Sequence, residues 1–251
     1  MAFASVGTFI SQNSKVSESS WSTTTEAAVA AGDLLIVVIA ADNIHTDDGE
    51  TADITGVTYD GTPMTKIKEF TNGNAAVDTG AMVAVFALQN AAATSSGAAV
   101  VASFGSAVVA KAMRGWKFTM DNAKVLTVEA SDTLANDGGD AGSVALLGLV
   151  NREHLVFRAT ASEATLGLVT ATSGWTSIYT FGDGGSTSGG AADTNQSSYG
   201  EFKIATSTGE TSDPTLTVGS IDHASVMAAF FEDSGVTPGG ESEMLMRRRR
   251  R

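Results

Sequence analysis

The sequence predicts an all-β protein, folded as a jelly-roll-like antiparallel β-sandwich. Two observations support this prediction. Short apolar segments rich in β-branched residues recur along the chain with Gly, Ser, Asn and Thr between them, and only 17% of the residues are charged. Regularly spaced short strands separated by turn residues are typical of sandwiches and barrels. Abundant Thr, Val and Gly with little Lys or Glu disfavours exposed helices.

The strand signals follow one another closely along the first half. Residues 34–41 (LLIVVIAA) form a continuous apolar run of the kind expected for a buried strand. Further strands are expected at residues 80–88, 98–104 and 108–120. In the last of these, Lys111, Arg114 and Lys117 interrupt the apolar positions, which predicts that one face of this strand is exposed to water.

The second half of the chain repeats the plan of the first. The paired segments are 34–41 with 154–161, 61–70 with 172–181, 80–88 with 198–206, 98–104 with 214–220, and 108–120 with 224–232. Each half is then a small sandwich, or the halves interleave as two sheets of a single sandwich. The joining segment 121–144 contains its own strand signal, KVLTVEAS. We therefore expect one β-sandwich over residues 1–232, built from sequence-related halves at about 14–120 and 121–232.

Residues 233–251 have no β pattern and carry Pro238, Gly239 and Gly240, which predicts a flexible tail. The tail ends in five consecutive arginines: Arg247, Arg248, Arg249, Arg250 and Arg251. Without them the chain has 10 basic and 28 acidic residues, a net charge of −18. A body of that sign repels phosphate backbones and anionic membranes, so we expect it to bind neither nucleic acid nor membrane. The arginines indicate an electrostatic contact with an acidic face of the same or an adjacent subunit, with an intersubunit contact favoured, or a solvated terminus.

Composition excludes some chemistry. The chain contains no cysteine, which rules out disulfides, thiolate metal sites and a cysteine nucleophile. The longest strongly apolar run is far shorter than the roughly 18 residues of a membrane-spanning helix. The segment MAFASVGTFI has neither the basic start nor the apolar core of a secretion signal. We therefore expect a soluble protein that is not exported by that route.

Several segments together resemble a β-sandwich family of tailed-bacteriophage structural proteins. They are VAAGDLLIVVIAADN, TSGWTSIYTF and YGEFKIATSTGETSDPTLTVGSIDHASVMAAFFED, within residues 14–232. The resemblance implies a component of a head spike, a decoration layer, a neck or a tail fibre. The first half has TPMTK where the family pattern has GWT, so a ligand role for Trp175 does not transfer to Met64.

Patterns that would indicate catalysis are not apparent. The nucleophile-elbow motif G-x-S-x-G is missing, and His45, His154 and His223 stand in isolation. His154 begins an apolar strand and His223 precedes another, which favours a place at a strand edge over a catalytic role. We expect no enzymatic activity and no cofactor.

Two groups of residues are the candidates for binding. The loop 42–53 gathers Asp42, Asp47, Asp48, Glu50 and Asp53, oxygen ligands that suit Ca²⁺, although without the spacing of an EF-hand. A solvated acidic loop is the interpretation we favour. Trp175 in a turn, with Tyr179 four residues later, is the best candidate for an exposed platform that contacts a glycan. For this pair we favour packing in the core.

The sequence therefore favours a non-enzymatic virion structural protein that acts through subunit assembly and surface contact. It would be assembled in the bacterial cytoplasm, with other copies of itself and other virion proteins as partners. The alternative is a carbohydrate-binding adhesin or receptor-binding module that recognises a host surface glycan. A polysaccharide hydrolase or lyase with two carboxylates ranks last, because no pair of acidic residues points to it.

Overall fold

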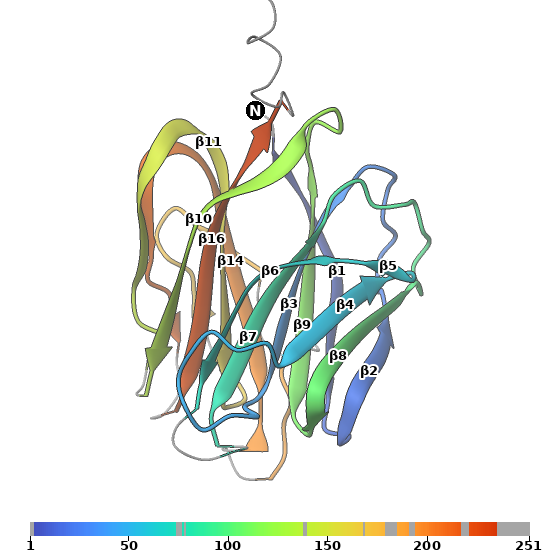
Figure 1. Cartoon of the computed structure of the whole chain (residues 1–251), viewed down its shortest axis with the longest axis vertical. Helices are drawn as coiled ribbons and strands as arrows, with labels where there is room; N and C mark the ends of the chain where they lie inside the picture. Colours follow the sequence, from blue (N-terminus) through green and yellow to red (C-terminus); the bar gives the residue numbers. More distant parts are fainter. Residues whose placement is uncertain are drawn as a thin grey trace, which may run out of the picture.

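The computed structural model describes residues 3–73, 77, 79–137, 140–167, 169–178, 185–190, 194–216 and 221–234. It confirms the all-β prediction: the strands form three large antiparallel sheets (Figure 1).

The first sheet consists, in order, of β1 (Ala4–Ser14), β9 (Lys111–Thr119), β3 (Leu34–Asp42), β7 (Ala81–Leu88) and β6 (Thr65–Asn72). The second consists of β2 (Glu18–Thr24), β8 (Ala99–Val108), β4 (Ile54–Tyr59) and β5 (Thr62–Pro63). The third consists of β10 (Val125–Asn136), β16 (His223–Asp233), β11 (Val144–Ser162), β14 (Ser197–Ser212) and β13 (Thr176–Ser177). A short pair, β12 (Val169–Thr170) and β15 (Thr215–Leu216), completes the described strands.

The first sheet is the middle layer of the molecule, between the second and third sheets (Figure 1). Its alternate residues therefore enter two different cores. Leu35, Val37 and Ile39 of β3 pack toward the second sheet. Leu34 and Ile36 pack toward the third, with side chains of β11 and β16. All nine residues of β3 are buried for this reason, which confirms the buried strand expected from its continuous apolar run.

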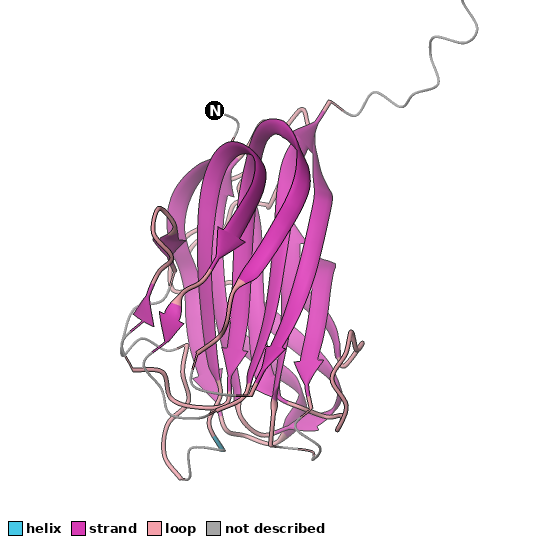
Figure 2. Cartoon of the chain, turned by 90° about the vertical axis from the view of Figure 1, so that its left-hand side faces the viewer, coloured by secondary structure: helices cyan, strands magenta, loops and turns pink. Residues whose placement is uncertain are grey.

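β11 and β14 form a long ribbon that bends back over the third sheet. They pair with each other along most of their length, whereas β16 pairs with β11 only from Leu155 onward. Figure 2 shows both strands arching over at one end of the molecule. Leu146 and Leu149 in the first part of β11 share a core cluster with Val156 from its second part. The ribbon thus covers the outer face of its own sheet.

The halves do not interleave as we expected. Each of the described sheets takes its strands from one half of the chain: β1 to β9 form the first two sheets, and β10 to β16 form the third sheet and the short pair. The halves meet face to face instead, and one core cluster combines Phe118 of β9 with Phe157 of β11 and Phe230 of β16. The joining segment contributes β10 to the third sheet, which confirms that it is part of the fold.

Four of the five predicted pairs of segments occupy the same positions in the first and third sheets, whereas β8 of the second sheet and β15 of the short pair do not correspond in this way. The order β9-β3-β7-β6 in the first sheet corresponds to β16-β11-β14-β13 in the third. The pairing register repeats as well, because Leu34 lies opposite Phe118 and Leu155 lies opposite Phe230. The structural counterpart of Leu34 is therefore Leu155, one residue beyond the His154 that the sequence comparison paired with it.

The prediction of a water-exposed face on β9 is wrong. Lys111, Arg114 and Lys117 are all buried, because β9 belongs to the middle layer and both of its faces are covered. Each cation donates to backbone carbonyls: the Nζ of Lys111 to Val16 at 2.5 Å, and the Nζ of Lys117 to Ala28 at 2.6 Å. Buried charges are tolerated where such donors are satisfied.

Candidate functional site

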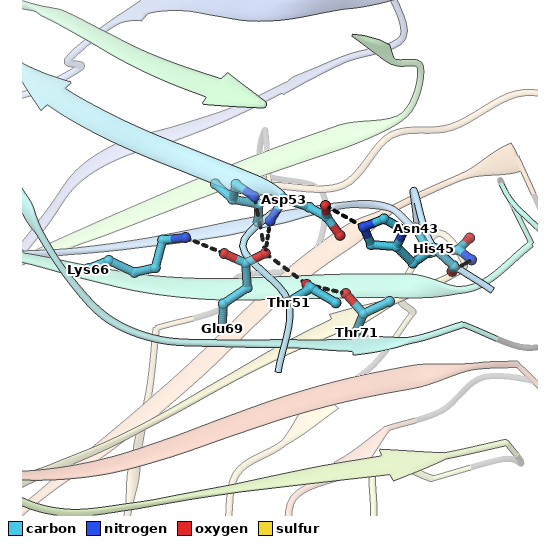
Figure 3. Close-up of polar contacts among 8 residues, drawn as sticks. Asn43, His45, Thr51, Asp53, Lys66, Glu69 and Thr71 are labelled. Carbon is cyan, nitrogen blue, oxygen red and sulfur yellow. Dashed lines mark hydrogen bonds and ion pairs between the residues drawn. The ribbon is translucent and has the colours of Figure 1, made fainter. Parts of the chain in front are cut away.

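The acidic loop, residues 42–53, packs along the outer edge of β6, and Glu69 of β6 holds it there (Figure 3). The Oε1 atom of this buried carboxylate accepts hydrogen bonds from the backbone nitrogens of Asp53 at 2.6 Å and Ile54 at 3.1 Å. It also accepts one from the Thr51 hydroxyl at 2.9 Å, while Oε2 pairs with the Nζ of Lys66 at 2.5 Å. Glu69 thus satisfies donors that the loop would otherwise bury without partners.

The loop also bonds to β6 through its backbone. The nitrogen of Gly49 donates to the carbonyl of Thr71 at 3.0 Å, and the nitrogen of Thr71 donates to the carbonyl of Gly49 at 2.8 Å. These bonds cover part of the free edge of β6. An unpaired edge strand is a template for unwanted association, and covering it is a common protection.

Asn43 anchors the first part of the loop. Its side-chain nitrogen donates to the carbonyls of His45 at 2.7 Å and Gly73 at 2.9 Å, and its Oδ1 accepts from the backbone nitrogen of Gly80 at 2.8 Å. The Nε2 of His45 lies 2.9 Å from a carboxylate oxygen of Asp53 (Figure 3). These contacts fix the course of the loop that leads from β3 to β4.

The five predicted calcium ligands do not converge on one point. Four of them have separate contacts: Asp42 accepts from the nitrogen of Ala110 at 2.8 Å, Asp48 accepts from the nitrogen of Gly73 at 3.0 Å, Glu50 pairs with Lys68, and Asp53 pairs with His45. The side chain of Asp47 is exposed. Within the described residues, no group of three or more His, Cys, Asp or Glu side chains is placed to hold a metal ion.

We predict that Glu69→Gln lowers the free energy of unfolding by about 2 kcal/mol, because the amide cannot accept every bond that the carboxylate accepts. It should also speed proteolytic cleavage within residues 44–52. Urea unfolding and timed digestion measure the two effects. The matched control is Glu50→Gln, which removes the pair that this largely exposed carboxylate makes with Lys68 and should change stability little. Equal stability of the two variants would contradict the anchoring role of Glu69.

The glycan-contact candidates have different outcomes. Trp175 is only 8% exposed and packs in the cluster beneath the folded-back ribbon, with Leu149, Val156 and Met227. This confirms the packing interpretation, and its ring does not present an open face to solvent. Tyr179 lies outside the described residues, as do Arg247 to Arg251 of the tail.

His223 begins β16, at a strand end as expected, whereas His154 lies within β11, and both side chains are buried. The Nδ1 of His223 lies 2.7 Å from the hydroxyl of Ser162, the residue opposite it on β11. Burial lowers the pKa of His223 to about 4; nearby Asp140 opposes this shift and Arg158 adds to it. At neutral pH the imidazole is therefore uncharged.

His154 contributes to a second contact, centred on Glu129 of β10. The carboxylate of Glu129 accepts from the backbone nitrogen of Val150 at 2.5 Å and from the Nε of Arg152 at 2.9 Å, and it lies 3.0 Å from the Nε2 of His154. Burial alone would raise the pKa of Glu129, but these donors outweigh burial and lower it to about 2. Glu129 thereby holds the bend of β11 against β10.

We predict that His223 makes the fold sensitive to mild acid. Its pKa is about 4 in the folded chain and about 6.5 when unfolded, so the unfolded state binds more protons as the pH falls. The contribution of His223 to the free energy of unfolding is fully present above pH 6.5. It is lost as the pH falls from 6.5 to 4, by up to about 3 kcal/mol. Urea unfolding at pH 7, 6 and 5 measures it. His223→Gln should flatten this dependence, whereas His45→Gln, at an exposed side chain, should keep it; equal slopes in the wild type and His223→Gln would contradict the assignment.

The sequence did not reveal the buried polar cluster under the folded-back ribbon, centred on Arg158 and Glu201. The guanidinium of Arg158 donates to the carbonyls of Ala141 and Gly142 at 2.8 Å and of Ser212 at 2.9 Å. Burial lowers the pKa of Arg158 to about 10, against the opposing charge of Glu201, so the group stays charged at neutral pH. The only sequence signal was the single Arg that interrupts the apolar segment LVFRATA.

Glu201 completes this cluster from the neighbouring strand β14. Its carboxylate accepts from the hydroxyls of Ser212 at 2.5 Å, Thr172 at 2.6 Å and Tyr199 at 2.7 Å. Burial and the carboxylate of Glu201 both raise the pKa of Tyr199 well above its usual value, so its hydroxyl remains a donor. The cluster joins the two strands of the ribbon to the sheet beneath them.

A scan against protein-family models found no match to this chain, and a search of the curated proteins found no similar one. Among the described residues there is also no helix of the length and apolar character needed to cross a membrane.

Proposed function

We propose that this chain is a non-enzymatic structural protein of a tailed-phage virion, a capsid decoration, spike, neck or tail-fibre component. The observation that carries the proposal is that the buried charged side chains bond to other parts of the fold. Glu69 holds a loop, Arg158 and Glu201 hold the ribbon, and Arg114 joins the two halves. These groups stabilise a rigid block, whereas catalysis requires charged groups that reach a substrate.

The segments that carry the family resemblance support the proposal by their positions. The segment that contains GDLL continues into β3, the GWT turn precedes β13, and the last segment contributes β14, β15 and β16. We take the repeated strand order as a duplication of one jelly-roll-like unit. On this proposal the partners are other copies of the chain and other virion proteins, and assembly takes place in the bacterial cytoplasm.

Quantitative mass spectrometry of purified particles tests the proposal. The chain should be present at a fixed copy number relative to the major capsid protein, through gradient purification and in independent preparations. Its absence from particles, or a copy number that falls with each purification step, would overturn the proposal.

A glycan array run on the same protein addresses the adhesin alternative. Because Trp175 is buried, no described contact favours glycan recognition by it. Glycan binding that is lost in Trp175→Ala, while the variant keeps the melting temperature of the wild type, would favour the adhesin.

A further inference from the structure

Four apolar side chains are exposed to solvent at one end of the third sheet. We call this surface the β10 margin: Val125 and Val128 of β10, with Leu147 and Val150 at the bend of β11. Their exposed fractions are 51%, 39%, 79% and 57%, and they make up half of the exposed large hydrophobic residues in the described chain. The bond from the Val150 nitrogen to Glu129, the residue after Val128, places the bend of β11 beside β10.

β10 also lies at the border of its sheet. Within the described residues its only strand partner is β16. On its other side the backbone nitrogen of Leu126 donates to Oε1 of Gln89 at 2.9 Å, so the side chain of Gln89 covers part of this border. The outer edge of β6 in the first sheet is partly covered by the acidic loop, through Gly49 and Thr71. Free strand edges combined with exposed apolar side chains are sites where an extended segment can bind.

The surroundings of the β10 margin are acidic. Asp233, the last residue of β16, lies opposite Val125, and the backbone nitrogen of Asp121 donates to a carboxylate oxygen of Glu232 at 2.6 Å. Two cations lie near these carboxylates: Lys124, beside them in sequence, and Arg152, whose guanidinium lies over the ring of Phe231 and is paired with Glu129. An apolar surface with an acidic border fits a segment that is apolar and then basic.

The chain itself contains such a segment. Residues 244–251 read MLMRRRRR, and the described part of the chain ends at Ser234, immediately after the strand end that lies opposite Val125. Nine residues separate Ser234 from Met244, with a root-mean-square reach of roughly 15–18 Å as a flexible linker. The stretch of β10 from Val125 to Glu129 is about 14 Å long. The segment can therefore reach the whole apolar part of the β10 margin.

We propose that residues 244–251 dock on the β10 margin of their own chain. Met244, Leu245 and Met246 cover the exposed valines and Leu147, and the arginines pair with the carboxylates at the border, where guanidinium groups bind strongly. The docked segment protects the apolar surface beside β10. This proposal does not depend on the virion role.

Disulfide formation between two introduced cysteines tests the proposal, and no native thiol competes because the chain has no cysteine. The variant carries Val128→Cys, at a side chain that is 39% exposed, and Leu245→Cys. The matched control has the same two cysteines and the same tail length, with Met244, Met246 and the five arginines replaced by serine. Formation of the disulfide within one chain is followed by mass spectrometry and gel mobility, at low salt and at 1 M NaCl.

We expect the variant to form the intrachain disulfide about tenfold faster than the control at low salt, because docking raises the local concentration of the partner thiol. High salt should reduce the difference by screening the arginines. Equal rates in the variant and the control would overturn the proposal. Disulfides that form only between chains would overturn the assignment to the same chain and identify a second copy as the occupant.

Discussion

Replacing Arg158 by Met is expected to lower the free energy of unfolding by about 3–5 kcal/mol, the largest effect of any single substitution that we predict. The guanidinium donates to three backbone carbonyls under the folded-back ribbon and faces the buried carboxylate of Glu201. Met fills a similar volume but leaves these acceptors without donors and the carboxylate without an opposing charge. Urea unfolding measures the loss.

Two comparisons make the Arg158 prediction specific. Arg152→Met removes an arginine that is about one third exposed, and it should cost much less. The double variant Arg158→Met with Glu201→Gln removes both charges, and it should recover part of the loss because no charge is then buried alone. If Arg158→Met were no more damaging than Arg152→Met, the cluster would not be what fixes the ribbon.

Arg114→Met is expected to uncouple the two halves of the chain and to cost about 2–4 kcal/mol, because buried carbonyls would lose a charged donor. Arg114 extends from β9 toward the third sheet and donates to the carbonyls of Ser198 at 2.7 Å and Ile178 at 3.1 Å. Its guanidinium passes so close to Gly185 that a Cβ atom at residue 185 would lie 2.3 Å from its Nε. Arg114 therefore joins first-half and second-half segments inside the molecule.

Hydrogen exchange followed by mass spectrometry tests this coupling. In Arg114→Met we expect β14 to exchange faster, while β8 in the second sheet keeps its protection. Lys117→Met is the matched control, because Lys117 donates to the carbonyl of Ala28 within the first half. That variant should lower stability and leave the relative protection of the two halves unchanged. Uniform loss of protection in both variants would contradict the coupling role of Arg114.

The strands were predictable from the sequence where they lie in a core. β3 was recognisable because a strand covered on both faces consists of consecutive apolar residues. The correspondence of four strands between the first and third sheets was also implied by the paired segments. The stacking of the halves was not predictable, because whether a sheet face meets water or another sheet depends on long-range contacts. This is why the cations of β9 were taken as marks of an exposed face.

The candidate site was also only partly predictable from the sequence, because its contacts are long-range. The acidic loop stood out by composition, but the group that organises it is Glu69, a single carboxylate that follows Lys66 and Lys68 in a strand. Composition cannot distinguish a carboxylate that accepts backbone donors from one that faces water. Likewise, Trp175 follows a Gly in a turn, where exposure is common, and the ribbon that buries it comes from residues distant in sequence.

The central structural claim is that both halves form one cooperative body through the face shared by the first and third sheets. Differential scanning calorimetry of the intact chain tests this claim most directly. We predict a single transition whose calorimetric and van't Hoff enthalpies agree. Two resolved transitions, each with the enthalpy of about half the chain, would show that the halves fold independently and would contradict the claim.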